Sequence, residues 1–354
     1  MEELMSNVNE TLLKEIETYV YNNYGCDRYE IEHFLTHHGE FLEKQREAIR
    51  IIESIMTIHG KKRLLRHVVE LARVEHGIRE LERGIRDHVV HALLSFILGI
   101  YLNEKFLKPL IGFPVDDFQW KLAGLLHDVG YPAPIARDIL RPFTEKINEI
   151  KRDLGFDSPD VFFKFVPVGL ENLANDLNAF DLIQECLNKW ELRIKAREEY
   201  NSMIATGDIC HGMISSLAVL YVIDLMYQKY NSKREYTDIY AVGTNINWNQ
   251  IYFERDIIPA CSAIYIHNLP NKCFADAKID PLKAPLAFLL KLSDYLQEWE
   301  RPSFTNQQGF SAAQFDIIID NGQIIFHADI PDDKKKKIKD EISSSLVAPN
   351  VHIN

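Results

Sequence analysis

The chain of 354 residues is 46% hydrophobic and 26% charged, with 16 glycines and 14 prolines. This balance is typical of a globular protein and excludes a disordered, collagen-like or linker-rich chain. The formal net charge of −12 makes duplex nucleic acid an unfavourable partner, because affinity for its backbone depends on clustered cations, although bound metal ions could still hold a small phosphorylated ligand.

Helical periodicity dominates the sequence as far as residue 300. The first predicted helices cover residues 8–22, 40–58, 62–83, 87–106 and 118–127. A charged and mostly helical stretch, 134–200, is expected to break at 155–159. Further helices are predicted at 203–230, from about Pro259 onward and at 283–300. After residue 301, the runs FDIIID and QIIFHADI flank Asn-Gly, which is the strongest short signal for a β-hairpin, and a final helix follows.

These elements predict a mainly α fold in three parts. Residues 1–61 form an N-terminal helical segment. Residues 62–301 form a helical bundle with a helical insertion at about 134–200. Residues 302–354 form a small C-terminal α+β appendage of a hairpin and a helix.

Several features predict a cytoplasmic protein without a membrane contact. The longest apolar run, 92–102, is too short to cross a bilayer and suits a buried helix. The acidic N-terminus does not resemble a secretory signal. The five cysteines are an odd number without a CxxC pair, so we expect reduced thiols.

Most of the 13 histidines lie in polar or amphipathic contexts, where solvated or capping roles are expected. Asp128 and Asp294 instead lie in apolar helical runs, and a buried carboxylate normally needs a partner or a metal. Imidazole and carboxylate together suit divalent metals. We therefore predict one shared polar centre that also includes the histidines of the most apolar helices: His88, His91, His127, His211 and His267.

The motif LLHDVGYP, with RDHVVH before it and LLKLSD after it, resembles the HD-domain superfamily of metal-dependent phosphohydrolases. The resemblance covers about residues 62–300 and implies an HD-domain helical bundle. It also implies one or two divalent ions, with Mn, Mg, Zn, Co and Fe all compatible. The order of the residues is similar to the two-metal version found in HD-GYP phosphodiesterases: His91, His127, Asp128, His211, His267 and Asp294.

The resemblance also implies roles for these residues. Asp128 would bridge two metals and help to generate the attacking hydroxide. His91, rather than His88, is favoured as the first ligand because it continues into the most apolar run, which leaves His88 beside the ligands or facing the substrate. Asp208, three residues before His211, is a candidate acceptor for that ring. The first metal would be held by His91, His127, Asp128 and Asp294, and the second by Asp128, His211 and His267.

The contacts for a substrate phosphate are less defined. Many HD relatives carry a lysine directly after HDxG, where this chain has Tyr131, which can offer only a hydrogen bond. Candidate cations are Lys291, Arg86 and Arg137. Lys291 lies one turn before Asp294, but a salt-bridged or snorkelling lysine is an equal alternative. The catalytic candidates are thus Asp128, His88, Lys291 and Tyr131.

The sequence therefore predicts a phosphohydrolase or phosphodiesterase that acts on a phosphate ester or anhydride, with a nucleotide as the favoured substrate. The insertion at 134–200 could cover the site, which favours a small enclosed substrate. One alternative is a diiron oxygenase of the HD fold, which uses a similar ligand order. A second is a non-catalytic module that senses a nucleotide or binds a partner through residues 302–354. The oligomeric state stays open, and a homo-oligomer is compatible with the sequence.

Overall fold

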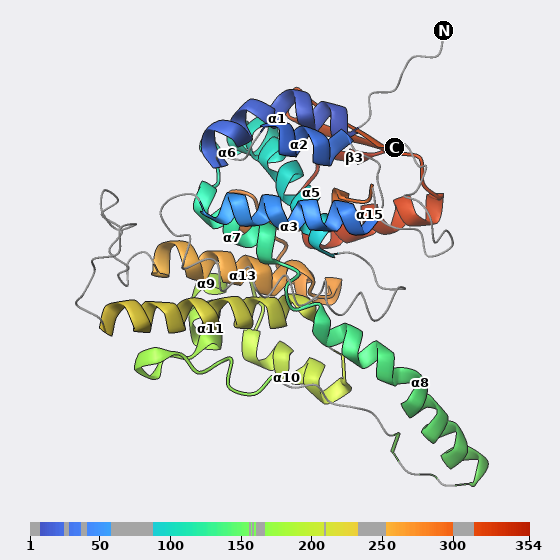
Figure 1. Cartoon of the computed structure of the whole chain (residues 1–354). Coiled ribbons are helices and arrows are strands. Elements are labelled where there is room, and N and C mark those ends of the chain that lie inside the picture. The colour runs from blue at the N-terminus through green and yellow to red at the C-terminus, as the bar shows by residue number, and fades with distance from the viewer. Residues whose placement is uncertain are drawn as a thin grey trace.

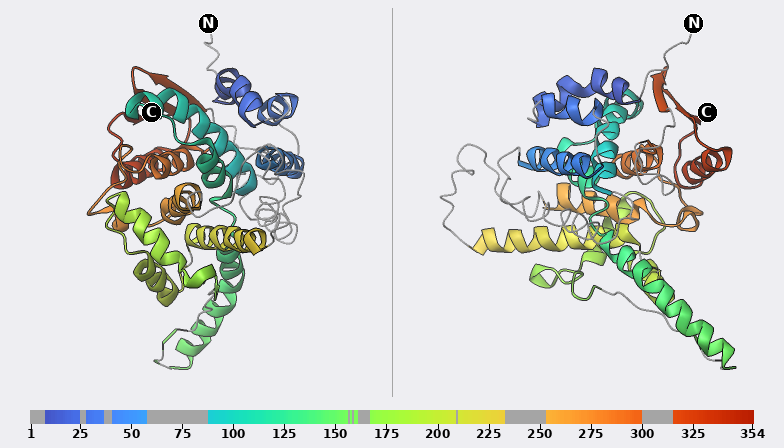
Figure 2. Two further views of the ribbon diagram at one scale, coloured as in Figure 1. Left: turned by 90° about the vertical axis from the view of Figure 1, so that its left-hand side faces the viewer. Right: turned by 45° about the vertical axis from the view of Figure 1, so that its right-hand side comes forward.

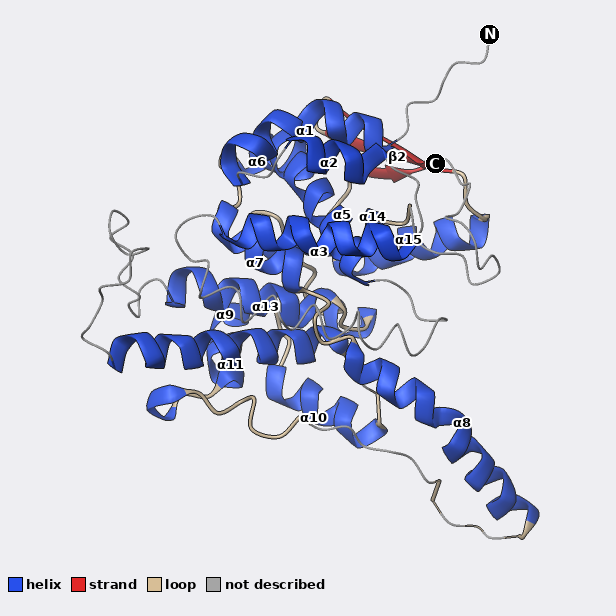
Figure 3. Cartoon of the chain, viewed as in Figure 1, coloured by secondary structure: helices blue, strands red, loops and turns tan. Residues whose placement is uncertain are grey.

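The computed structural model is mostly helical, with a small three-stranded sheet near the C-terminus (Figures 1 and 3). The mainly α prediction is confirmed. The predicted helix 62–83 and Arg86 lie outside the described residues. The structure describes residues 8–24, 28–36, 41–57, 88–155, 157, 159–160, 167–208, 210–232, 253–299 and 315–354.

The N-terminal segment contains α1 (Val8–Tyr24), α2 (Arg28–Thr36) and α3 (Phe41–Thr57). The second of these helices was not predicted, because nine residues give too short a window for periodicity. In α1, apolar residues recur every four positions, so that they line one face of the helix. This face is buried in the core and consists of Val8, Leu12, Ile16 and Val20.

The central helix α5 (His88–Leu102) is buried along its whole length. It continues through η1 (Asn103–Leu107) into α6 (Lys108–Ile111). This continuous helix, His88–Ile111, is long and apolar enough to cross a membrane, which the sequence analysis did not anticipate. However, 89% of its most apolar window is buried inside the protein, as in the core helix of a globular fold.

The next helix, α7 (Asp117–Leu126), begins at a side-chain cap. The Asp116 carboxylate accepts hydrogen bonds from the backbone N–H groups of Phe118 and Gln119. The helix packs against α5 through Trp120, whose indole N–H donates to the Phe96 carbonyl at 3.2 Å. After a tight turn, α8 (Pro132–Asp153) projects away from the rest of the protein (Figures 1 and 2).

The region after α8 contains more, and shorter, helices than the sequence predicts. The structure has η2 (Ala174–Asp176), α9 (Ala179–Lys189) and α10 (Ala196–Thr206). The predicted helix 203–230 is interrupted at Gly207, whose φ of +77° ends α10 in the left-handed conformation. The next helix, α11 (His211–Ser232), therefore begins at His211.

The remaining helices of the main body are η3 (Phe253–Ile257), α13 (Ile258–His267), η4 (Asn271–Phe274) and α14 (Pro285–Leu296). The predicted start near Pro259 is confirmed, with the proline in the first turn of α13. This helix packs against α7, α11 and α14. Four separate stretches of the chain, namely α7, α11, α13 and α14, therefore lie together.

The C-terminal part contains β1 (Phe315–Asp320), β2 (Gln323–Ala328), α15 (Asp332–Ser345) and β3 (Val351–Ile353). The predicted hairpin is confirmed, because Asp320 pairs with Gln323 across an Asn-Gly turn in which both residues have positive φ. The parallel strand β3 was not predicted. In addition, α15 packs on α14, and β1 packs on α1. The division of the chain into three parts stays a prediction.

Candidate metal centre

The candidate centre lies where the ends of five helices meet. His88 and His91 are in the first turn of α5, and His127 directly follows the last residue of α7. His211 is the first residue of α11, and His267 is the last residue of α13. Asp294 lies in the last turn of α14. Asp128 continues the chain after α7, so its carboxylate reaches the space between these ends.

The carboxylate of Asp128 is the hub of the cluster. Its side chain is only 6% exposed. Both of its oxygens lie close to imidazole nitrogens from three helices and the α7 terminus. The distances are 3.0 Å to His88 Nδ1, 3.1 Å to His211 Nε2, 3.4 Å to His267 Nε2, 3.7 Å to His127 Nε2 and 3.8 Å to His91 Nε2.

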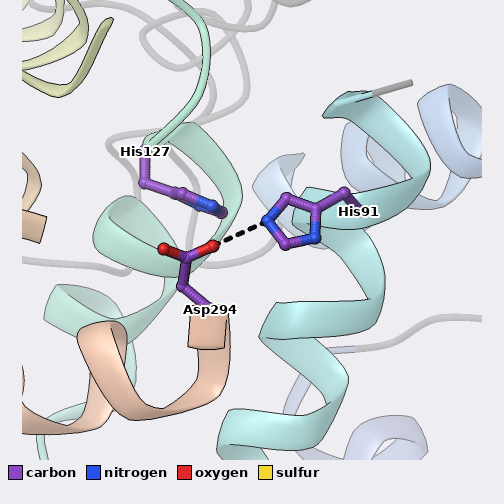
Figure 4. A group of neighbouring side chains, drawn as sticks. All are labelled: His91, His127 and Asp294. Carbon is purple, nitrogen blue, oxygen red and sulfur yellow. Dashed lines mark hydrogen bonds and ion pairs between the residues drawn. The ribbon is translucent and has the colours of Figure 1, made fainter. Parts of the chain in front are cut away.

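Two overlapping groups of side chains could each hold a metal ion. His91, His127 and Asp294 form the first group, with His91 Nε2 at 2.9 Å from Asp294 Oδ1 (Figure 4). His127, Asp128 and His267 form the second. Within each group the ligand atoms lie within 4.8 Å of one another. The structure thus places His91 in the first group, whereas His88 lies outside both.

Hydrogen bonds to backbone carbonyls fix the tautomers of two histidines. His127 Nδ1 lies 3.0 Å from the Gly124 carbonyl, and His267 Nδ1 lies 2.6 Å from the Ile264 carbonyl. A carbonyl only accepts, so in both rings Nδ1 carries a proton, and in a neutral ring the lone pair of Nε2 then faces the centre. Such a hydrogen bond on the far nitrogen is the usual support of a metal-binding histidine.

The polar atoms at the centre fit a cation. His127 Nε2 is buried and has no hydrogen-bond partner among the described residues, and the same holds for Asp128 Oδ1. His211 Nε2 and His267 Nε2 lie 3.2 Å apart. Buried acceptors without a donor are costly, and a metal ion beside His127 Nε2 and Asp128 Oδ1 would satisfy both of them. The buried cluster of histidines and aspartates could therefore bind metal.

The electrostatics of the site favour ionised carboxylates and a neutral His88. Burial alone would raise the pKa of Asp128, but the surrounding histidines outweigh it and hold this pKa well below its usual range. For Asp294, burial is likewise outweighed, chiefly by His91, and the pKa is lowered. Burial lowers the pKa of His88 to about 3, although Asp128 opposes the shift. The centre thus presents negative carboxylates and imidazole lone pairs, as a metal site requires.

His88 and Tyr131 form one wall beside the cluster. Their rings are stacked with centroids 3.3 Å apart, and the Tyr131 ring lies 4.8 Å from the ring of His211. His88 bonds to Asp128 through Nδ1. The catalytic roles of these two residues stay predictions, but both lie in contact with the group that would bind the metals.

Two glycines allow the close packing of the centre. A Cβ at Gly130 would lie 2.5 Å from the Ser215 nitrogen, and the Gly130 N–H donates to the Ser215 hydroxyl at 2.8 Å. A Cβ at Gly212 would lie 2.7 Å from the ring of His267. The turn after Asp128 and the first turn of α11 can therefore approach the ligands only because both positions lack a side chain.

The two candidate phosphate contacts that the structure describes are engaged with protein groups, and their role toward a substrate stays a prediction. Lys291 is fully buried, and its ammonium donates to the His267 carbonyl at 2.6 Å, above the ring of Phe274. It therefore supports the end of α13 and is not at the surface. Arg137 lies in α8 and is paired with Asp138 at 3.0 Å.

Asp208 is not the acceptor for His211. It lies in the loop after α10, where its side chain is 78% exposed and accepts from the Thr206 hydroxyl. The prediction was wrong because it assumed one continuous helix through Gly207. Instead, the side-chain nitrogen of Asn268 lies 3.1 Å from His211 Nδ1. The tautomer of His211 therefore depends on the orientation of that amide.

Sequence reasoning also missed Gln297. Its side chain is fully buried, and its Oε1 accepts a short hydrogen bond from His91 Nδ1. The signal was present, since Gln297 follows Asp294 by three positions, and residues three apart on a helix share a face. Gln297 was not considered because only histidines and acidic residues were candidates for ligands.

The geometry defines a mostly helical protein with a buried histidine and aspartate cluster that is compatible with an HD-type metal site. No protein-family model matches the chain, and neither a curated protein nor a solved structure matches it significantly. The likeness to HD domains therefore rests on the residues of this chain and their arrangement.

Proposed function

We propose that the chain is a metal-dependent phosphohydrolase or phosphodiesterase that acts on a phosphate ester or anhydride of a small molecule, such as a nucleotide. The observation that carries this proposal is the position of Asp128, whose buried carboxylate lies within 4 Å of imidazoles from separate helices. His91, His127, Asp128 and Asp294 would hold one ion. Asp128, His211 and His267 would hold the other.

The contributions of the protein follow from this arrangement. When bound, two divalent ions in such a site lower the pKa of coordinated water and neutralise charge on a phosphoryl group. The bonds to backbone carbonyls place the proton of a neutral His127 or His267 ring on Nδ1, which leaves Nε2 available to a metal. His88, which stays neutral because of its burial, orients the Asp128 carboxylate through Nδ1. Tyr131 stacks on His88 and limits the space beside the ligands.

The alternative is an HD-fold diiron oxygenase, and one observation favours it. Of the three predicted phosphate contacts, the two that the structure describes are engaged with protein groups. Lys291 donates to the His267 carbonyl, and Arg137 is paired with Asp138. A substrate with little negative charge would need neither cation. The non-catalytic alternative requires only binding, which the same cluster would also support.

Metal analysis of anaerobically purified protein, followed by turnover assays, separates these functions. Two metal ions per chain and release of phosphate from a panel of phosphomonoesters, phosphodiesters and nucleotides are expected. Turnover that consumes oxygen and requires iron would instead establish the oxygenase. Nucleotide binding without turnover under all metals would establish the sensing module. A chain that binds none of these metals would contradict the proposed centre itself.

A further inference from the structure

We propose that Gln297 is a positioning residue that fixes the tautomer of His91 in the metal centre. Trp299 holds Gln297 in place, and Asn9 of helix α1 in turn holds Trp299. The inference deepens the proposed function, because it assumes that His91 binds metal. It assigns to the N-terminal segment a part in building a site from which it is remote in sequence.

The orientation of the Gln297 amide follows from its partners. Its Nε2 lies 2.6 Å from the Trp299 carbonyl, and because a carbonyl only accepts, the amide nitrogen must be on that side. The amide oxygen then faces His91 Nδ1 in a short hydrogen bond. An amide oxygen also only accepts, so Nδ1 must carry a proton. The remaining nitrogen, Nε2, faces Asp294 Oδ1 at 2.9 Å, where either a proton or a metal ion must lie between them.

The same reasoning extends this chain of bonds to the N-terminus. The Asn9 side-chain nitrogen donates to the Leu35 carbonyl at 2.9 Å, which fixes the amide of Asn9. Its oxygen therefore accepts from the indole N–H of Trp299, also at 2.9 Å. Asn9, Trp299 and Gln297 are at most 3% exposed. Helices α1 and α2 thus anchor the residue whose carbonyl orients Gln297.

His91 needs a side-chain acceptor for a geometrical reason. His127 and His267 lie at the C-terminal ends of their helices, where backbone carbonyls are free of helical partners and accept from Nδ1. His91 lies in the first turn of α5, where the carbonyls already bond within the helix. The Ser95 hydroxyl lies 3.5 Å from His91 Nδ1, too far for a strong hydrogen bond. Gln297 therefore supplies what the backbone supplies to the other two rings.

A role in packing alone explains a buried glutamine less well than a role in orienting His91. A fully buried amide costs free energy unless all of its groups are bonded, and a leucine would fill a similar volume without that cost. Both ends of the Gln297 amide are used, and one of them is a candidate ligand. Loss of such a hydrogen bond to a metal-binding histidine typically lowers metal affinity by about 10–100-fold.

The test compares Gln297→Leu, which removes the acceptor, with Gln297→Glu, which keeps an oxygen for His91 Nδ1. Asn103→Leu is the matched control. Asn103 is 2% exposed and bonds through both ends of its amide to Val115, just beyond the far end of α5. Affinity of the full chain for Co²⁺ is measured by competition titration, and unfolding is measured in parallel. Imidazole ¹⁵N NMR on the metal-free chain reports which nitrogen of His91 is protonated.

We expect Gln297→Leu to lower the affinity for one Co²⁺ by about 10–100-fold. Gln297→Glu keeps the acceptor for His91 Nδ1 but loses the donor to the Trp299 carbonyl, so it should restore part of that affinity at a lower stability. Asn103→Leu should lower stability alone. Wild-type affinity in Gln297→Leu, or an unprotonated His91 Nδ1 in the wild-type chain, would overturn the inference. If the wild-type chain binds no Co²⁺, Zn²⁺, Mn²⁺ or Fe²⁺ and Nδ1 is protonated, the proposed metal function fails while the orientation of Gln297 stands.

Discussion

Replacement of Gly212 by alanine should remove one of two bound metal ions while the chain stays folded. The added Cβ would lie 2.7 Å from His267 Cε1, 2.8 Å from its Nδ1 and 2.9 Å from the Ile264 carbonyl. The ring cannot rotate away freely, because its Nδ1–H bond to that same carbonyl would break. The clash therefore displaces His267 Nε2 from Asp128, to which it now lies at 3.4 Å.

The expected cost combines three effects. Overpacking costs about 1–3 kcal/mol, and loss of the hydrogen bond from His267 costs about 0.5–1.5 kcal/mol. The higher helix propensity of alanine returns up to about 1 kcal/mol. We expect a net loss of about 0.5–4.5 kcal/mol in the free energy of unfolding, which sums these figures. Denaturant unfolding of the metal-free chain measures it.

Metal content and a control complete this experiment. Mass spectrometry of dialysed protein should find one ion fewer per chain in Gly212→Ala than in wild type. The control is Gly124→Ala, whose Cβ would have the rings of Phe96 and Trp120 as its nearest neighbours, at 3.1 Å, and which keeps the carbonyl that accepts from His127. It should retain both ions. An equal metal content and affinity in Gly212→Ala would refute the assignment of His267 to the second ion.

Three further changes test other parts of the structure. Asp128→Ala should abolish turnover together with at least one ion, because its carboxylate would be shared by both ions of the proposed site; full metal content with normal turnover would exclude a bridging role. Lys291→Met should lower metal affinity without changing KM for a phosphate substrate, because it removes the donor to the His267 carbonyl. A change in KM alone would instead support the prediction that Lys291 contacts the substrate phosphate. Burial raises the pKa of Tyr101 from 10.0 to about 12. The unfolded chain therefore loses this proton first, and between pH 10 and 12 wild type should lose stability relative to Tyr101→Phe, as pH-dependent unfolding would show.

Features with local causes could be predicted from the sequence. The hairpin depends on Asn321 and Gly322, which adopt positive φ at low cost, and the surrounding runs alternate in the required register. The helix at Pro259 and the apolar stripe of α1 are also encoded within a few residues. The candidate ligands were found because histidine and aspartate are unusual inside apolar helices. These patterns are local, so no alignment or tertiary information was needed.

Features that depend on distant partners could not be predicted. Strand β3 has only three residues and pairs in parallel with β2, so it exists only once the sheet is assembled. The break at Gly207 was missed because the apolar pattern continues across it. Because one continuous helix was assumed, Asp208 was predicted to share a face with His211. The residue that contacts His211 Nδ1 is instead Asn268, which follows α13. The burial of Lys291 was not anticipated under either of its two predicted roles, because helical phase does not show which face another helix covers.

The arrangement explains why the ligands indicate metal binding more strongly than they indicate a reaction. His127 and His267 are oriented by their own helix ends, and His91 is oriented by Gln297. These hydrogen bonds turn the Nε2 atoms of the three rings toward the centre, and they do so independently of the substrate. The choice between phosphoryl transfer and oxygen chemistry depends instead on the charges that meet the substrate. Because Lys291 and Arg137 are engaged with protein groups, a phosphate would have to be neutralised mainly by the metal ions. A hydrolase built in this way should therefore lose substrate affinity and turnover together when its metals are removed.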